Sequence, residues 1–363
     1  SGVLEKKTRN YRKESKVEKP KIRSYFNTLI HLLGLNQYKS RLIVSEQFEN
    51  WVKDFDPDYI YTQLSNLELI HFVNDLHGKT QIPIAIHIMD DWPITIGKEG
   101  ILASYWNNKI HDNFRDLVNK SSSFFSISEA MSEEYLLRYS KKFIPFHNPV
   151  DIDFWKKDSK NNYEIKDTFK ILYAGRIGTG IRSCFVDIAI AINNLNKKGY
   201  KIELQMQITN DDPFIKDLSY YECIKFNKMI PYGDLPKKFA EADLLLLPND
   251  FEAEATPFLK YSMPTKASEY MISGTPILLY ARLETAITAH AIKHGWAYIV
   301  SERGTEFIEN AIVKIIENLE IRRNLGVKAQ KFAQKEYDGY HIREQFCKAF
   351  KKSSYHKLSV SIE

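Results

Sequence analysis

The chain has 363 residues, of which 44% are hydrophobic and 27% are charged, and its net charge is +5. This composition is typical of a soluble globular protein, and the length predicts two domains that each bury a core. No apolar run approaches the ~18 residues that a membrane span needs. The three scattered cysteines form neither a metal-ligand spacing nor a disulfide framework, which favours a reducing cytoplasm.

Positive charge is concentrated at the N-terminus. Residues 1–45 hold eleven Lys and Arg against three Glu, a net charge of +8, so the remaining residues sum to −3. An apolar stripe at helical spacing follows the basic run and consists of Phe26, Leu29, Ile30 and Leu33. Residues 6–33 therefore suit an anionic membrane surface, which would make the protein peripheral at the inner face of the membrane. The alternative is a mobile basic loop followed by a core helix.

No aromatic–basic platform or helix-turn-helix pattern accompanies this charge, so we expect no nucleic-acid partner. The chain opens with Ser1 and Gly2 and has no initial methionine, which is typical of a remnant of tag cleavage. A helix is expected around 46–55, before the first convincing strand.

Apolar runs and helical periodicity alternate along the rest of the chain. Strands are predicted near 58–64, 82–89, 123–127, 143–147, 169–175, 202–208, 224–230, 243–248, 276–281 and 297–301. Helices are predicted near 67–77, 100–119, 129–140, 184–197, 234–241, 265–273, 286–294, 305–318 and 320–336, with a terminal helix around 340–352. This alternation predicts an α/β fold with doubly wound parallel sheets, which bind ligands at the carboxyl ends of their strands.

The strand at 82–89 delivers His87, Asp90 and Asp91 to its carboxyl end. A histidine beside carboxylates suits proton transfer or the binding of a hydroxyl group. The alternative is a hydrogen-bonded core histidine with an aspartate that caps the next helix. Two adjacent aspartates are not the Asp-x-Asp pattern of metal-dependent transferases, and no His/Cys cluster indicates zinc, so no metal is expected.

A block around Lys266 holds the most informative chemistry in the chain. Pro264-Thr265-Lys266 opens a predicted helix, and Glu269 follows Lys266 on the same helical face. A helix N-terminus with a lysine suits phosphate, and a carboxylate suits vicinal hydroxyl groups. This combination matches a nucleotide diphosphate-sugar, although an amphipathic helix with a solvated ion pair is the alternative.

Two further motifs belong to the same half of the chain. A strand at 170–175 ends in Gly175-Arg176 and enters a glycine-rich turn, and a buried strand runs through 242–248 to a proline. Together with 126–129, 148–151 and the block that ends in Gly274-Thr275-Pro276, these motifs resemble GT-B glycosyltransferases. The resemblance is greatest to the retaining family 4 (GT4) group and covers roughly residues 80–335.

The resemblance implies two Rossmann-like domains that face each other across a cleft. The expected acceptor-side domain is 1–152, the linker is 153–168, and the nucleotide-sugar domain is 169–337. Residues 338–363 are expected to form a helix that crosses back to the first domain. The first domain shows neither the initial apolar strand of the family nor its glycine-rich loop, so either the front of this domain is missing or truncated here, or the protein departs from the family pattern.

The resemblance also implies roles for individual residues. Arg176 and a second basic residue clamp the donor diphosphate in the family, and Arg182 takes the second role here with a one-residue slip because Ile181 holds the usual position. The expected donor-binding residues are Arg176, Gly178, Arg182, Thr265, Lys266 and Glu269. The expected catalytic residues are His87, Asp90 and Asp91. Many relatives have a glutamate against the donor sugar where this chain has Tyr261.

These expectations predict a metal-independent and cofactor-free glycosyltransferase. It would move a sugar from a nucleotide diphosphate-sugar to a glycan or lipid-linked acceptor, with retention, in polysaccharide or glycoconjugate synthesis. The alternatives are a non-catalytic GT-B-like binding or scaffold subunit and a nucleotide-sugar epimerase. The glycine-rich stretch 178–183 also approaches a dinucleotide fingerprint, but the acidic residue that this fingerprint needs comes late, at Asp211.

Overall fold

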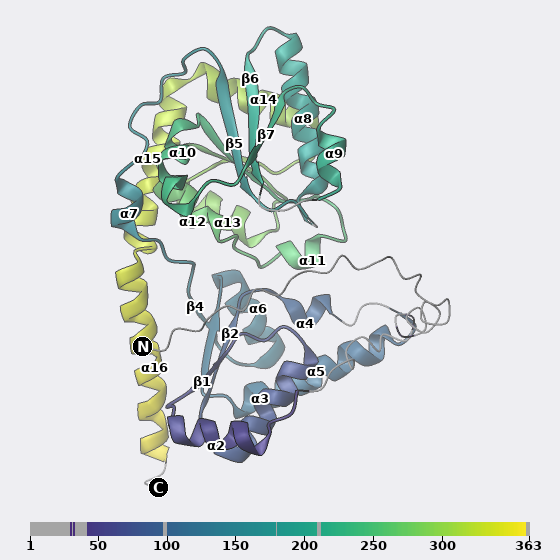
Figure 1. Cartoon of the computed structure of the whole chain (residues 1–363), viewed down its shortest axis with the longest axis vertical. Coiled ribbons are helices and arrows are strands. Elements are labelled where there is room, and N and C mark those ends of the chain that lie inside the picture. Colours follow the sequence, from purple (N-terminus) through teal and green to yellow (C-terminus); the bar gives the residue numbers. More distant parts are fainter. Residues whose placement is uncertain are drawn as a thin grey trace, which may run out of the picture.

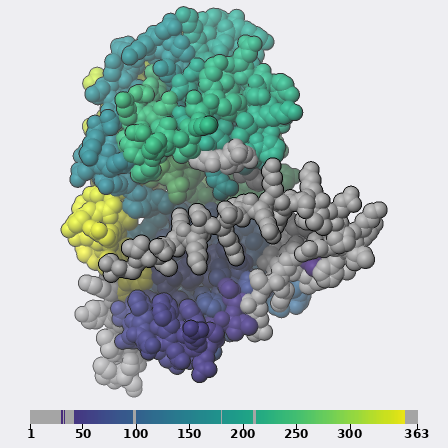
Figure 2. All heavy atoms as spheres, viewed as in Figure 1, coloured from purple at the N-terminus to yellow at the C-terminus, as the bar shows by residue number. Residues whose placement is uncertain are grey.

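The structure is a computed structural model that describes residues 30, 32, 42–96, 100–178, 180–208 and 212–360, with side chains described up to residue 350. It consists of two α/β domains, and the last helix runs from the second domain along the first (Figure 1). In Figure 2 the two domains form distinct bodies, one purple and blue and the other teal and green. The predicted membrane-docking segment, residues 6–33, lies outside the described residues apart from Ile30 and Leu32.

The N-terminal domain is built on a four-stranded parallel sheet with the order β1-β2-β3-β4. Its strands are β1 (Ile60–Thr62), β2 (Ile84–Ile88), β3 (Ser123–Ser126) and β4 (Ile144–Pro145). Its helices are α2 (Glu46–Phe55), α3 (Leu67–Thr80), α4 (Trp92–Thr95), α5 (Ala103–Lys120) and α6 (Glu129–Tyr139). The strand order does not reverse within the described residues of this domain.

The sheet of the N-terminal domain is covered on both faces. Ile84, Ile86 and Ile88 of β2 alternate onto one face, where they pack in a core with residues of α3 and α5. Ala85 points to the other face, which is covered by Phe346 and Phe350 of α16 (Gly339–Val360). The last helix of the chain therefore completes the core of the first domain.

The C-terminal domain contains a six-stranded parallel sheet with the order β10-β9-β8-β5-β6-β7. The strands are β5 (Phe169–Gly175), β6 (Ile202–Ile208), β7 (Ile224–Lys228), β8 (Leu244–Pro248), β9 (Ile277–Tyr280) and β10 (Tyr298–Val300). The order reverses between β5 and β8, and α/β sheets of this kind bind ligands outside the carboxyl ends of the strands at such a switch point.

Helices cover both faces of this second sheet. The face that carries Leu172 of β5 packs against α10 (Leu235–Glu241), α12 (Lys266–Ile272) and α13 (Ala286–His294). The opposite face packs against α8 (Arg182–Lys197) and α14 (Thr305–Glu317). The remaining helices of the domain are α9 (Phe214–Leu218), α11 (Thr256–Leu259) and α15 (Leu319–Glu336).

The chain crosses between the domains twice, and the two crossings lie side by side. The Val150 N–H donates to the Tyr337 carbonyl at 2.8 Å, and the Gly339 N–H donates to the Val150 carbonyl at 3.0 Å. Just after the first crossing, α7 (Ile152–Lys156) packs against α10 and α12 of the C-terminal domain.

The α/β class and the parallel sheets expected from the sequence are confirmed, and all ten predicted strands are present. Hydrophobic periodicity missed α4, α7, α9 and α11 because four or five residues are too few to show a helical repeat. The terminal helix, expected around 340–352, runs from Gly339 to Val360. Within the described part of the chain, no helix has the length and apolarity that crossing a membrane requires.

Candidate functional site

Lys266 lies at the switch point of the C-terminal sheet. Its ammonium sits 4.1 Å from the centroid of the Tyr173 ring, which belongs to β5. A side chain at Gly175 would place its Cβ 2.4 Å from Lys266 Nζ, so the missing side chain at the end of β5 makes room for the ammonium. The lysine at the start of α12 is therefore held directly over the carboxyl end of the central strand.

The charge of Lys266 is only partly balanced by the protein, through the carboxylate of Glu269, which acts on it without direct contact. The side chain is partly buried, and within the described residues its ammonium has no ion pair or hydrogen bond. Desolvation lowers the pKa of Lys266 to about 8. A partly desolvated cation without a counter-ion is costly, and a bound anion would remove that cost.

Glu269 lies one helical turn after Lys266 on α12. Its Oε1 accepts a hydrogen bond of 3.2 Å from the Tyr232 hydroxyl, and burial raises the pKa of the carboxyl group. Tyr232 begins a short 3-10 turn, Tyr232–Asp234, between β7 and α10. The sequence placed Lys266 and Glu269 on one face of a helix, but it gave no role to Tyr232. Its position just after a predicted strand, at the ligand-binding edge, was the available signal.

Arg176 and Gly178 follow β5 at the same edge. The Arg176 side chain is exposed, and its backbone carbonyl accepts the hydroxyl of Tyr173, the ring under Lys266. The space around Gly178 is open, because a Cβ there would meet no atom within 4 Å. Arg176 thus follows directly on Gly175, the residue beside the Lys266 ammonium, and its side chain is accessible. Thr265 is exposed directly before α12, a helix of only seven residues.

Arg182 is the first residue of α8, and it is already paired. Its guanidinium lies 2.7 Å from the Asp212 carboxylate, beyond the end of β6. This ion pair lowers the pKa of Asp212. A phosphate that binds Arg182 must therefore share this cation with a carboxylate.

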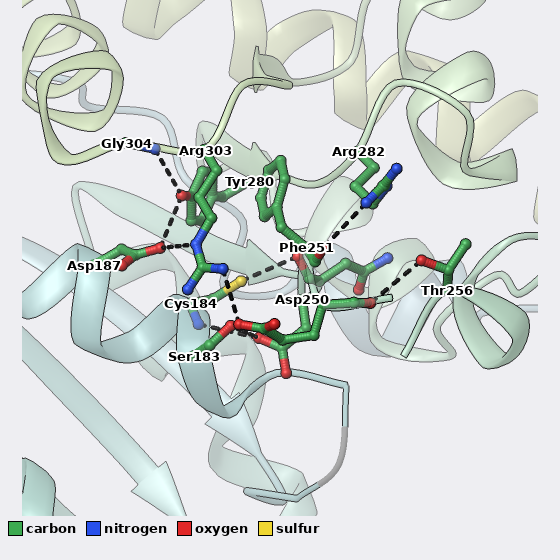
Figure 3. Close-up of polar contacts among 12 residues, drawn as sticks. Ser183, Cys184, Asp187, Asp250, Phe251, Thr256, Tyr280, Arg282, Arg303 and Gly304 are labelled. Carbon is green, nitrogen blue, oxygen red and sulfur yellow. Dashed lines mark hydrogen bonds and ion pairs between the residues drawn. The ribbon is translucent and has the colours of Figure 1, made fainter. Parts of the chain in front are cut away.

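The N-terminus of α8 is occupied by a carboxylate from the loop after β8. Asp250 Oδ1 accepts the Cys184 N–H at 3.0 Å and the Ser183 hydroxyl at 2.7 Å (Figure 3). The pyrophosphate of a dinucleotide normally takes this place in a Rossmann fold. Asp250 therefore disfavours the dinucleotide reading of the glycine-rich stretch. The sequence presented Asp250 only as a loop residue, without a sign of this contact.

Two arginines hold the same loop. Arg303 lies 2.8 Å from the carboxylate of Glu252 and 3.3 Å from that of Asp187, and Arg282 donates to the Phe251 carbonyl at 3.0 Å (Figure 3). The loop that follows β8 is thus tied to α8 and to the loops after β9 and β10.

His87 of the N-terminal domain is buried beneath α16. The Tyr61 hydroxyl lies 2.6 Å from His87 Nδ1, and the rings of Phe125 and Phe346 surround the imidazole. Burial lowers the pKa of His87 to about 4, so the ring is neutral at pH 7. Its Nε2 is buried and has no hydrogen-bond partner among the described residues.

The two neighbouring aspartates have different environments. Asp91 is buried, and both of its oxygens accept hydrogen bonds of 2.8 Å from the Arg138 guanidinium, while Tyr135 donates to Oδ1 at 3.0 Å. This bonding favours a structural role for Asp91 over the catalytic role expected from the sequence. Asp90 lies just before α4, which contacts α11 of the other domain, and the residue is exposed to solvent. The surrounding protein still desolvates its carboxyl group in part, which raises the pKa.

Tyr261 joins the domains. Its hydroxyl donates to Glu134 of α6 at 2.8 Å, and its carbonyl accepts the Ser128 hydroxyl at 2.8 Å. The Arg138 guanidinium lies 5.7 Å from the centroid of the Tyr261 ring. The residue that stands where many relatives have a sugar-binding glutamate therefore contacts the N-terminal domain.

A group of histidines lies where α6 meets α13. His147 bonds to Glu129 at 3.1 Å, and its ring centroid lies 5.3 Å from that of His290. Trp296 Nε1 donates a hydrogen bond of 2.9 Å to His290 Nδ1, which must therefore be unprotonated. Burial lowers the pKa of His290 to about 3. No three His, Cys, Asp or Glu side chains in the described part are grouped so as to hold a metal ion.

No family model and no curated protein matches the sequence, but solved structures match the fold. Sucrose-phosphate synthase from Thermosynechococcus elongatus matches with a TM-score of 0.63 at 13% identity, over 88% of this chain and 77% of that chain. HepE from Anabaena, solved with UDP and glucose, matches with a TM-score of 0.63 at 14% identity, over 86% and 84%. An alpha,alpha-trehalose-phosphate synthase from Burkholderia vietnamiensis matches with 0.61 at 11% identity, over 91% and 85%. The chain therefore has the two-domain GT-B fold of these glycosyltransferases.

Proposed function

We propose that this protein is a glycosyltransferase that moves a sugar from a nucleotide diphosphate-sugar to a hydroxyl of a glycan or lipid-linked acceptor. The observation that carries the proposal is the Lys266 ammonium at the switch point, which has no direct ion pair among the described residues and lies one helical turn from Glu269. A diphosphate supplies the missing negative charge, and the ribose hydroxyls of the same molecule reach a carboxylate on the same helix face.

The chemistry needs cations more than bases. As the bond between the anomeric carbon and the diphosphate oxygen breaks, negative charge develops on the leaving group, and Lys266 and Arg176 stabilise it. In the retaining course that the family resemblance implies, the acceptor oxygen bonds to the anomeric carbon on the same face. The acceptor proton then passes to the departing phosphate oxygen. We infer that these side chains serve in place of a metal or cofactor.

Among the three predicted catalytic residues, Asp90 is the best placed to meet an acceptor. It is exposed beside the contact between α4 and α11, whereas Asp91 is bonded inward and His87 lies beneath α16. UDP-glucose is the first donor to test, since HepE was solved with UDP-glucose and with UDP. Membrane docking through residues 6–33, the cytoplasmic location, the GT4 assignment and a role in polysaccharide synthesis stay predictions.

A non-catalytic binding subunit is the second candidate. Tyr261 supports it, because this residue bonds to Glu134 where many relatives place a sugar-binding glutamate. Such a subunit would bind a nucleotide through Lys266 and Glu269 without turning it over. Nothing in the geometry specifically favours the nucleotide-sugar epimerase.

Thermal denaturation in the presence of UDP, GDP, ADP and TDP, and of their common sugar conjugates, tests the donor site. A ligand that binds only the folded state raises the melting temperature once its concentration exceeds Kd. We expect a selective rise with one nucleotide, followed by its release from the matching sugar conjugate when an acceptor extract is added. Binding without release would favour the non-catalytic subunit, and no rise with any nucleotide would overturn the donor site.

A further inference from the structure

Among the described residues, one side chain donates a hydrogen bond to the Glu269 carboxylate, and that side chain packs against the segment between the domains. Tyr232 bonds to Glu269 Oε1 at 3.2 Å, and its ring stacks on Phe154 of α7 with centroids 5.2 Å apart and planes 4° from parallel. We propose that Tyr232 is a positioning residue that holds Glu269 in the orientation that receives the nucleotide ribose, and that Phe154 fixes Tyr232. This inference rests on the proposed donor site.

The Tyr232 ring must be held by its neighbours to keep one orientation, because the residue belongs to a three-residue turn and is 56% exposed. A free tyrosine in such a turn would populate several rotamers, and its hydrogen bond would lose conformational entropy each time it formed. The stack on Phe154 and the edge of Trp155, at 6.3 Å and 87°, restrict the ring. Trp155 is itself stacked on Phe239 of α10 at 5.4 Å.

The hydrogen bond from Tyr232 occupies one oxygen of the Glu269 carboxylate and leaves the other available. With the Tyr232 hydroxyl on Oε1, Oε2 remains for ribose hydroxyls, and no other described side chain donates to Glu269. Burial raises the pKa of Glu269, while the Tyr232 hydroxyl and the charge of Lys266 act in the opposite direction. The other charged group that acts on Tyr232 is Asp151, at the start of α7. Without the tyrosine donor, Glu269 is both less fixed and more easily protonated.

The Tyr232→Phe variant is the direct test, since phenylalanine keeps the stack on Phe154 and removes only the hydroxyl. A hydrogen bond to a charged group is typically worth about tenfold or more in an equilibrium constant, but Tyr232 acts on UDP only through Glu269, so we expect Kd for UDP to rise about five- to tenfold. The Kd for 2′,3′-dideoxy-UDP, which lacks the hydroxyls that Glu269 would bind, should stay within about twofold of the wild-type value. The acid limb of the UDP affinity profile should move to higher pH.

Two further variants separate positioning from general damage. Phe154→Leu leaves the hydroxyl but loosens the ring, and we expect a smaller rise of about two- to threefold for UDP alone. Tyr220→Phe, at a tyrosine that is 76% exposed at the opposite edge of the sheet, is the matched control and should change nothing. In the Glu269→Ala background, which lacks the acceptor of this hydrogen bond, Tyr232→Phe should add little further loss, because the two changes remove one interaction.

An equal loss of affinity for UDP and for its dideoxy analogue would overturn the inference, since it would indicate a structural role. An unchanged Kd for UDP in Tyr232→Phe would overturn it as well and would leave the proposed function intact. If the wild-type protein binds no nucleoside diphosphate, the donor site and this inference fall together, which isothermal titration of the unmutated chain decides first.

Discussion

Two partly buried cations, Lys266 and Arg138, have opposite surroundings. Arg138 donates to both oxygens of Asp91 and to Glu134, and these carboxylates raise its pKa further despite burial. Among the described residues, the Lys266 ammonium has no direct ion pair and lies over the face of Tyr173, and burial lowers its pKa although the charge of Glu269 acts in the opposite direction. A cation that the protein satisfies holds the structure together, whereas a cation that it leaves unsatisfied is available to a ligand.

The strongest test of this contrast removes the partner of Arg138. Asp91→Ala leaves a buried guanidinium with half of its carboxylate partners, and we expect the free energy of unfolding to fall by about 3–5 kcal/mol. Urea denaturation measures this loss. The Kd for UDP should stay close to the wild-type value when the folded fraction is accounted for, and a loss of UDP binding without a loss of stability would contradict the structural role.

Lys266→Ala should give the opposite result. Hydrogen bonds between charged partners contribute about 1.5–3 kcal/mol, so affinity for UDP should fall roughly ten- to hundredfold. The melting temperature should hold or rise, because the variant removes a desolvated charge that has no direct ion pair. Lys201→Ala is the matched control, since this exposed lysine lies at the other edge of the same sheet. Unchanged UDP affinity in Lys266→Ala would refute the site.

His290, at the junction between the domains, has a third kind of environment, in which burial keeps the side chain neutral. Because the pKa of His290 is lowered from 6.5 to about 3, the unfolded chain takes up a proton below pH 6.5 that the folded chain does not. Stability is therefore complete above pH 6.5 and lost as pH falls. We expect His290→Gln, whose amide oxygen still accepts from Trp296, to abolish about 2 kcal/mol of that loss between pH 6.5 and 4.5. Parallel pH slopes for variant and wild type in thermal melts would show that His290 does not titrate in this window.

Arg182 lies between the two extremes and should show the smallest effect. The Arg182 side of its pair with Asp212 is exposed to solvent, and solvent-exposed pairs contribute about 0–1 kcal/mol. We expect Arg182→Ala to weaken UDP binding by less than about fivefold and to leave stability unchanged. A loss as large as that of Lys266→Ala, measured by the same titration, would move Arg182 into the centre of the donor site.

The C-terminal half was predictable because its chemistry is local in the sequence. Lys266 and Glu269 share one turn of a helix, and Gly175-Arg176 directly follows a strand, so periodicity alone places them at one edge. The environments of His87 and Asp91 depend on residues far along the chain. The sequence around His87 does not indicate that Phe346 covers its ring, and the sequence around Asp91 does not indicate an ion pair with Arg138.

The contacts that sequence reasoning missed have the same character. Asp250 caps a helix that begins more than sixty residues earlier, and Tyr232 bonds to a glutamate thirty-seven residues later. Each looks like an ordinary polar loop residue until the sheet brings the two segments together. Tyr261 departs from the family pattern, and only the fold reveals its contact with Glu134.

The last helix has a consequence for how the protein is made. Phe346 and Phe350 complete the face formed by Ala85 and Phe125, so the core of the first domain is completed only by residues that are synthesised after the whole C-terminal sheet. The C-terminal sheet, by contrast, draws all of its strands from one continuous stretch, 169–300. Domains usually fold in the order of their synthesis. In this chain the second domain can complete its sheet while the first domain still lacks the helix that covers one face of its own sheet. The second domain can therefore finish folding before the first, which reverses the usual order.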